Sequence, residues 1–237
     1  MSYDDFFELV KNRRSFRRFK SDPVPKEILE KVLEAARHSP SAGNSQPWEF
    51  VVVQDVVTKR SITKSITSEY KELREADPNM YWAVAVQPHL FTAPVLIIVC
   101  GDRRLQETYP AHLEGEILLR QSLAISIYTL QLAAASFGLA TAWGTMQTES
   151  RETRIRQLLG IPDVYTIDHI IPLGYPDEEK EKSDKALRPV RERASFRREL
   201  DEIVHYERYD RGKFRSDEKV KEFIWSKTVT RIPRGLG

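Results

Sequence analysis

The run PVLIIVCGD at residues 94–102 limits the possible folds more than any other stretch of this sequence. It is apolar almost throughout, and apolar and polar residues do not alternate along it. A strand with one face in water alternates, whereas a strand buried on both faces does not. The run therefore predicts a central strand buried on both faces, in a chain whose 237 residues are enough to bury a core.

The rest of the chain mixes helical and strand patterns without strict alternation. Residues 25–38 and 113–137 carry apolar residues at helical spacing, and the second helix is apolar almost all round from Leu123 onward. Such a surface is typical of a core helix or of a seam between subunits. Residues 49–54 and 165–173 have the composition and alternation of strands. This mixture predicts an α+β fold rather than a doubly wound sheet.

Charge and composition narrow the class of partner. The net charge is only +2, which gives no general electrostatic case for nucleic acid or for an anionic membrane. No secretory signal is visible at the N-terminus, and the apolar stretches are expected to be too short to span a bilayer. Cys100 is the single cysteine, so no internal disulfide is possible, and a buried core position is expected for it. A cytoplasmic location follows as the expectation.

Several familiar catalytic patterns are missing from the sequence. There is no GxGxxG dinucleotide fingerprint, no GxxxxGK[ST] loop and no GxSxG elbow. The five histidines are scattered without metal-ligand spacing, so no metal site is predicted. If the chain is an enzyme, its reactive group is therefore expected to be a bound organic cofactor rather than a side chain.

Two basic clusters offer donors for a phosphate. The first is RRSFRRF, in which Arg13, Arg14, Ser15 and Arg17 supply guanidinium groups and a hydroxyl within five residues. The second is the pair Arg197 and Arg198. The alternative for each cluster is a solvated basic turn, because charge runs usually lie in water.

Five segments together resemble the nitroreductase family of flavin enzymes. In chain order they are RRSFRRF, PSAGNSQPWEF, GLATAWGTM, IIPLGYPDE and RRELDEIVHYERY, and the matches run from about residue 11 to residue 209. The family has an R-[RH]-S-x-[RK] motif followed by a P-S-x-x-N-x-Q-P-W segment. The resemblance implies a nitroreductase-like α+β fold, in which a central mixed, mainly antiparallel sheet is flanked by helices. It also implies an intertwined homodimer.

The resemblance further implies FMN, bound without a covalent bond where two subunits meet. The positions that match the family's phosphate and pyrimidine motif are Arg13, Arg14, Ser15 and Arg17, with Arg197 and Arg198 at the C-terminal basic position. The positions that match the loop laid against the flavin by the partner subunit are Pro40, Ser41, Ala42, Asn44 and Gln46. The positions that match the segment near the reactive edge of the ring are Trp143, Gly144 and Thr145. No catalytic side chain is expected, since flavin N5 is the reactive centre.

The sequence departs from the family pattern in three places. Ala140 stands where the family usually has glycine. Glu199 stands where proline is common, which leaves the phosphate assignment at Arg197 and Arg198 open by one residue, and the segment ALRPVRER offers Arg188 as a competing candidate. The tail beyond Asp210 is longer than the family pattern. Residues 1–210 are expected to form one FMN-binding domain, and residues 211–237 an extension that packs on its own or on a partner subunit.

The implied activity is an FMN-dependent oxidoreductase that works by a ping-pong exchange. NADH or NADPH delivers a hydride, leaves, and is replaced by an acceptor such as a nitroaromatic, a quinone or an activated alkene. Tyr81, Trp82 and Phe91 lie in a predicted loop or lid and are expected to contact the substrate, although they also suit ordinary loop packing. Two alternatives remain: a dehalogenating or flavin-destroying branch of the same superfamily, and a non-catalytic protein that binds anions or nucleic acid. The sequence leaves open the acceptor, the preferred nicotinamide and the role of the extension.

Overall fold

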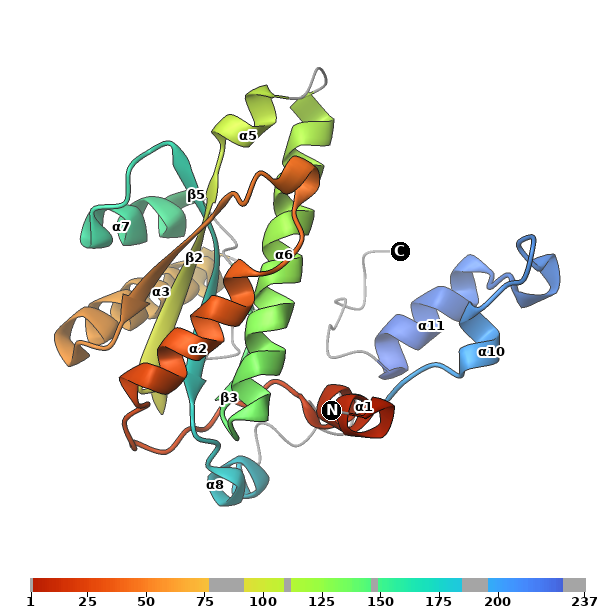
Figure 1. Ribbon diagram of the computed structural model, residues 1–237, viewed down its shortest axis with the longest axis horizontal. Helices are drawn as coiled ribbons and strands as arrows, with labels where there is room; N and C mark the ends of the chain where they lie inside the picture. The colour runs from red at the N-terminus through yellow and green to blue at the C-terminus, as the bar shows by residue number, and fades with distance from the viewer. Residues whose placement is uncertain (1, 77–91, 109–111, 146–148, 185–195, 228–237) are drawn as a thin grey trace. The chain divides into compact units, whose positions relative to one another are not determined.

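The computed structural model describes residues 2–76, 92–108, 112–145, 149–184 and 196–227 (Figure 1). The chain divides into two compact units. The first contains residues 1–70 and 86–178, and the second contains residues 71–85 and 179–237. The domain boundary expected at residue 210 stays a prediction.

A sheet forms the centre of the first unit. Its strands are β1 (Trp48–Val53), β2 (Val95–Asp102), β3 (Ala140–Thr141), β4 (Gly144–Thr145) and β5 (Tyr165–Gly174). The order is β1-β2-β5-β3, β4 also pairs with β5, and all these pairings are antiparallel. The expected α+β fold with a mainly antiparallel sheet is confirmed, and the 94–102 run is the inner strand β2.

Helices precede, interrupt and follow these strands. In the first unit they are α1 (Tyr3–Asn12), α2 (Lys26–Arg37), α5 (Arg104–Glu107), α6 (His112–Ser136) and α7 (Glu149–Leu159), with the 3₁₀ turn η1 (Ala42–Asn44). The helix α3 (Val56–Ala76) and the short helix α8 (Glu178–Ser183) each run from the first unit into the second. The second unit also contains α10 (Leu200–Ile203), the 3₁₀ turn η3 (Arg211–Lys213) and α11 (Asp217–Lys227).

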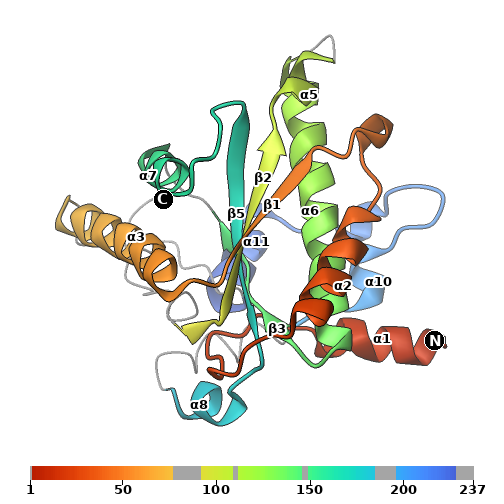
Figure 2. The same cartoon turned by 60° about the vertical axis from the view of Figure 1, so that its left-hand side comes forward.

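Helices cover both faces of the sheet, which explains the apolar run in β2. Figure 2 shows α2 and α6 on one face and α3 and α7 on the other. Val95, Ile97 and Val99 belong to the core cluster that includes α2 and α6. The residues between them are equally buried, so that every side chain from Val95 to Cys100 is almost fully shielded from water.

The helix α6 corrects one expectation. Residues Glu114–Ser136 are long and apolar enough to cross a membrane by length and composition, contrary to the sequence-based expectation that no stretch would be. One face of this helix is buried in the core through Leu119, Leu123 and Ile127. Core helices of soluble proteins pass the same test, so α6 fits its place against the sheet.

Burial makes the single thiol unreactive. Desolvation raises the pKa of Cys100 to about 12, from an ordinary value of 9.0. Because the thiolate is the nucleophile, each unit of this rise lowers the reactive fraction about tenfold. We therefore expect the native protein at pH 8 to react with a disulfide reagent such as DTNB about 1000-fold more slowly than the denatured protein does. Labelling of native Cys100 at the denatured rate would contradict this placement.

Candidate functional site

The basic segment RRSFRRF lies along one edge of the sheet. It leaves α1 at Arg13 and becomes extended. Ser15 forms a parallel bridge with Thr141 of β3, and the Phe16 amide donates to the Thr141 carbonyl at 2.9 Å. Phe16 and Phe19 are buried and anchor the segment in the core. The structure thus brings the first arginine cluster beside the strand that leads into Trp143 and Gly144.

Three arginines of this segment have different surroundings. The Nε of Arg13 is buried and has no hydrogen-bond partner among the described residues. Its guanidinium carbon lies 5.8 Å from the centre of the Tyr128 ring of α6. Arg14 stacks over Phe16 at 4.7 Å, and Arg17 donates to the Ser15 carbonyl at 3.4 Å. A buried N–H without an acceptor costs about 1–3 kcal/mol, so the Arg13 position favours an anion at this edge.

The loop from Pro40 to Gln46 has an unusual backbone. Gly43, Asn44 and Gln46 have φ values of 55°, 55° and 46°, in the left-handed region that residues other than glycine seldom adopt. The backbone amide of Gln46 donates to the Ser41 hydroxyl at 2.9 Å, and the backbone amide of Ala42 donates to the Ser122 hydroxyl of α6 at 3.2 Å. These bonds hold the loop in a defined shape, while Asn44, Ser45 and Gln46 stay exposed. Strain of this kind is frequent where a loop clamps a ligand.

The loop and the arginine cluster lie at opposite edges of the sheet. The loop leads into β1, whereas Ser15 is bridged to β3, and β2 and β5 lie between them. Neighbouring strands are about 4.8 Å apart, so three such steps separate β1 from β3 by roughly 14 Å, and the Ser15 segment lies one step beyond β3. The sheet therefore does not bring the two predicted groups together within one chain.

The segment Trp143–Thr145 forms the end of the same edge as the arginines. Gly144 pairs with Ile170 and Thr145 pairs with His169, both in β5. Trp143 is 38% exposed. Its ring meets the His169 ring edge-on, with 4.6 Å between the ring centres.

A buried Asp–His pair lies beside Trp143, and the sequence pattern does not predict it. Asp168 and His169 are both buried in β5, and the Asp168 carboxylate bonds to Nδ1 of His169. The other carboxylate oxygen lies 3.4 Å from a guanidinium nitrogen of Arg120 on α6. The available signal was the dipeptide Asp-His inside the otherwise apolar strand YTIDHIIPLG.

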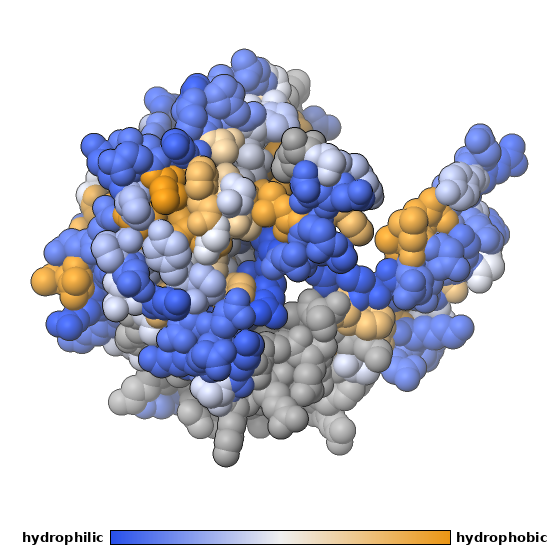
Figure 3. All heavy atoms as spheres, turned by 60° about the horizontal axis from the view of Figure 1, so that its bottom comes forward, coloured by the Kyte–Doolittle hydropathy of each residue, from blue (hydrophilic) through white to orange (hydrophobic). Residues whose placement is uncertain are grey.

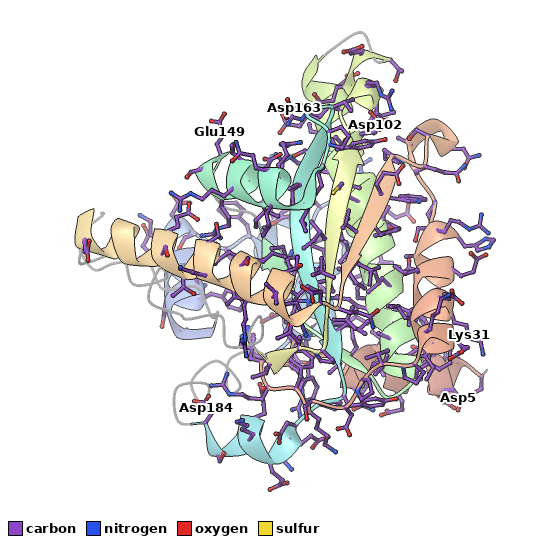
Figure 4. The ribbon with its side chains drawn as sticks, turned by 90° about the vertical axis from the view of Figure 1, so that its left-hand side faces the viewer. Asp5, Lys31, Asp102, Glu149, Asp163 and Asp184 are labelled. Atoms are coloured by element: carbon purple, nitrogen blue, oxygen red, sulfur yellow. The ribbon has the colours of Figure 1, made fainter. Side chains whose placement is uncertain are left out.

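Asp168 also lines a polar cavity of about 510 Å³. Figure 4 labels two of the carboxylates around it, Glu149 at the start of α7 and Asp163 just before β5. The remaining lining residues come from α5 and the residue before it, from α6 and α7, and from β5: Arg103, Gln106, Glu116, Leu119, Arg120, Glu152, Thr153, Arg156 and Thr166. Ion pairs connect many of them, including Arg120 with Glu116 at 3.0 Å and Arg103 with Glu152 at 3.5 Å.

The second basic cluster belongs to the second unit. Arg197 donates to the Phe196 carbonyl at 2.7 Å, and Arg198 donates to the Glu202 carbonyl at 2.9 Å. Their approach to a phosphate stays a prediction. The expected lid residues Tyr81, Trp82 and Phe91, and the competing Arg188, lie outside the described residues. In the part of the chain that the structure describes, no group of three or more His, Cys, Asp or Glu is arranged to hold a metal ion.

Comparisons with known proteins agree on one relationship. The model of the nitroreductase family matches residues 10–175. A Methanothermobacter thermautotrophicus protein, named as an NADH dehydrogenase/NAD(P)H nitroreductase, is 34% identical over 175 residues, which cover 73% of this chain and 78% of the relative. The iodotyrosine deiodinase of Nematostella vectensis is 29% identical, covering 79% of this chain and 73% of the relative.

A solved structure has the same fold as the chain. It is that of oxidized iodotyrosine deiodinase bound to FMN and 3-iodo-L-tyrosine, with a TM-score of 0.62 and 26% identity. The superposition covers 86% of this chain and all of that chain, 100% of its length.

Proposed function

The chain belongs to the nitroreductase family, and we propose that it is an FMN-dependent oxidoreductase that carries a hydride from NADH or NADPH to a small-molecule acceptor. One observation carries the proposal. The buried Arg13 Nε has no partner among the described residues, and it lies on a segment bridged to the strand that precedes Trp143 and Gly144. A phosphate donor set thus stands next to the segment expected at the reactive edge of a flavin.

The residues at this edge fit an FMN phosphate. A dianionic phosphate needs two or three cationic side chains around it. This segment supplies three guanidinium groups and one hydroxyl, from Arg13, Arg14, Arg17 and Ser15. The unpartnered Nε of Arg13 is the donor that a phosphate oxygen would satisfy. The family resemblance also assigns Arg197 and Arg198 to the phosphate, and that assignment stays a prediction. An arginine near the pyrimidine edge also stabilises negative charge there.

When bound, FMN supplies the redox chemistry, since it accepts a hydride from a nicotinamide and passes two electrons to an acceptor. The chain's own residues bind, orient and shield. Gly144 has no side chain, so no Cβ stands at this position beside the expected ring. Tyr81, Trp82 and Phe91 are proposed to select the acceptor by stacking on it. The acceptor is expected to bind after the oxidised nicotinamide has left.

We propose that the complete site needs two copies of the chain. The loop from Pro40 to Gln46 and the arginine cluster lie at opposite edges of one sheet, so the loop is available to a second copy. An apolar stripe on the outer face of α6, formed by Ile117, Ile125 and Tyr128, is left exposed and suits the contact between the copies. In the space-filling view, orange apolar residues reach the surface among blue hydrophilic ones (Figure 3). A cytoplasmic location remains a prediction.

The test of the proposal is the colour of the purified protein. We expect a yellow preparation whose absorbance near 450 nm bleaches when NADH or NADPH is added without oxygen and returns when a nitroaromatic or a quinone is supplied. Parallel-line kinetics with a varied acceptor would support the ping-pong order. A colourless protein that takes up no FMN on reconstitution would overturn the proposal and favour a non-catalytic anion-binding protein.

A second candidate is reductive dehalogenation. It is favoured by the likeness to iodotyrosine deiodinases in both sequence and structure. The two candidates are distinguished by incubating the reduced protein with 3-iodo-L-tyrosine and measuring iodide. Release of iodide at a rate that exceeds quinone reduction would make dehalogenation the activity of this chain.

A further inference from the structure

The pairing of β2 with β5 is interrupted at Asp168. Val99 of β2 pairs with His169, and Cys100 pairs with Ile167, so two steps along β5 oppose one step along β2. Asp168 is therefore the extra residue of a β-bulge. In a regular strand, neighbouring side chains point to opposite faces. The bulge breaks this alternation, which allows the Asp168 carboxylate to reach Nδ1 of His169.

The bulge buries two polar side chains, Asp168 and His169, at positions where apolar residues would cost less free energy. Asp168 and His169 stand between Ile167 and Ile170 in the core of the sheet, and the two side chains are 7% and 10% exposed. Taking such groups out of water costs several kcal/mol, and well-packed apolar residues would avoid that cost. Bulges are also concentrated next to active sites, where they redirect a side chain. A purely structural role therefore explains this pair poorly.

The Asp168 carboxylate determines the state of the imidazole. An ionised carboxylate only accepts hydrogen bonds, so we assign the proton of the bond to Nδ1 of His169. The arrangement fixes the tautomer and leaves Nε2 as the nitrogen that exchanges a proton. Among the described residues, no hydrogen bond is made by Nε2. Arg120 pairs with the second carboxylate oxygen, and the polar cavity beyond it gives water access to Asp168.

His169 lies next to the segment assigned to the reactive edge. It pairs through its backbone with Thr145, and its ring lies against Trp143. We propose that His169, oriented by Asp168, donates the proton that two-electron acceptors need at this site. The proposal rests on the proposed oxidoreductase function and adds a protein proton donor to a site whose reactive centre is the flavin.

The proposed step balances for a quinone acceptor. Its conversion to a hydroquinone takes up one hydride, which carries two electrons, and one proton. The hydride originates from NAD(P)H by way of the bound cofactor. The His169 imidazolium breaks its Nε2–H bond, and that proton forms one O–H bond of the hydroquinone. The neutral imidazole then regains a proton from water, while the Asp168 carboxylate keeps its contacts with Nδ1 and with Arg120.

Comparison of two acceptors tests the step directly. Protein reduced with dithionite is mixed in a stopped-flow instrument either with a benzoquinone, which needs a proton, or with ferricyanide, which takes one electron and no proton. We expect His169→Gln to slow reoxidation by the quinone about 100-fold, the usual lower range for general acid catalysis, and to change reoxidation by ferricyanide less than about twofold. Asp168→Asn is also expected to slow reoxidation by the quinone, by a smaller factor. The same two rates measured with this variant test the step if His169→Gln does not fold.

The controls separate a proton donor from a structural pair. His38→Gln changes an exposed histidine at the end of α2 and is expected to leave both rates as in the wild type. The dissociation constant for FMN, measured by adding apoprotein to free flavin and following its fluorescence, is expected to stay within about twofold in His169→Gln. Equal losses with both acceptors, or no loss with either, would overturn the role of His169. A wild-type protein that binds no FMN and reduces neither acceptor would instead overturn the proposed function.

Discussion

Replacing Arg13 with alanine is expected to raise the dissociation constant for FMN by about 10- to 100-fold and to change the melting temperature of the apoprotein little. A hydrogen bond to a charged group contributes about 1.5–3 kcal/mol, and each 1.4 kcal/mol is a factor of ten in affinity. In the apoprotein the same substitution removes a buried Nε that lacks a partner among the described residues. That gain offsets the removal of the Arg13 guanidinium from the Tyr128 ring.

The measurement is a titration of the apoprotein with FMN, followed by flavin fluorescence. Arg37→Ala is the matched control, because Arg37 is an exposed arginine of α2 paired with Glu34 at 2.5 Å. Arg17→Ala is expected to weaken FMN binding in the same direction as Arg13→Ala. Rising ionic strength is expected to weaken the wild type more than Arg13→Ala, since a phosphate contact is screened by salt. Unchanged affinity in Arg13→Ala would mean that the phosphate binds elsewhere.

The layers of this fold are well determined by the sequence where burial is strongest. The unalternating run at 94–102 predicts a strand buried on both faces, and β2 has helices on each side. The long apolar pattern at 113–137 predicts α6 to within one residue at each end. Helix α5 was missed, because a single turn of four residues carries no period that a pattern can reveal.

The residue types of the candidate site can be predicted from the sequence, but their arrangement in space cannot. A dense set of arginines and a polar loop are visible as local motifs. The order of the strands places Ser15 beside Thr141 and the loop at the opposite edge of the sheet. Strand order is set by contacts between distant segments, so neither motif contains it.

The Asp168–His169 pair shows where a local pattern fails. Read as a regular strand, YTIDHIIPLG places the two side chains on opposite faces, and no interaction between them is expected. The bulge that joins them is a property of the register between β5 and β2. Such a departure from the pattern is expected mainly at functional sites, where a local rule is broken for a specific geometry.

Replacing Ile125 with glutamate is expected to separate the proposed dimer and, with it, to remove FMN. Ile125 is an exposed apolar residue of α6 in the stripe with Ile117 and Tyr128. A charge buried in such a contact without a partner costs about 3–5 kcal/mol, which raises the dimer dissociation constant roughly 100- to 4000-fold. Light scattering at micromolar concentration gives the oligomeric state, and absorbance near 450 nm gives the FMN content. Val57→Glu is the control, because Val57 is an exposed apolar residue of α3, on the other side of the sheet.

The oligomeric state and the FMN content are expected to change together, because the apolar stripe of α6 is continuous with the candidate site. Tyr128 belongs to the stripe and also lies beneath the Arg13 guanidinium. In the proposed dimer the loop at the opposite edge of the sheet contacts the flavin of a second copy, so a monomer is expected to lack those polar contacts. A monomeric Ile125→Glu that keeps its full FMN content would show that one chain completes the site. A dimer that persists would mean that the copies meet elsewhere, and the exposed stripe of α6 would then need a different partner.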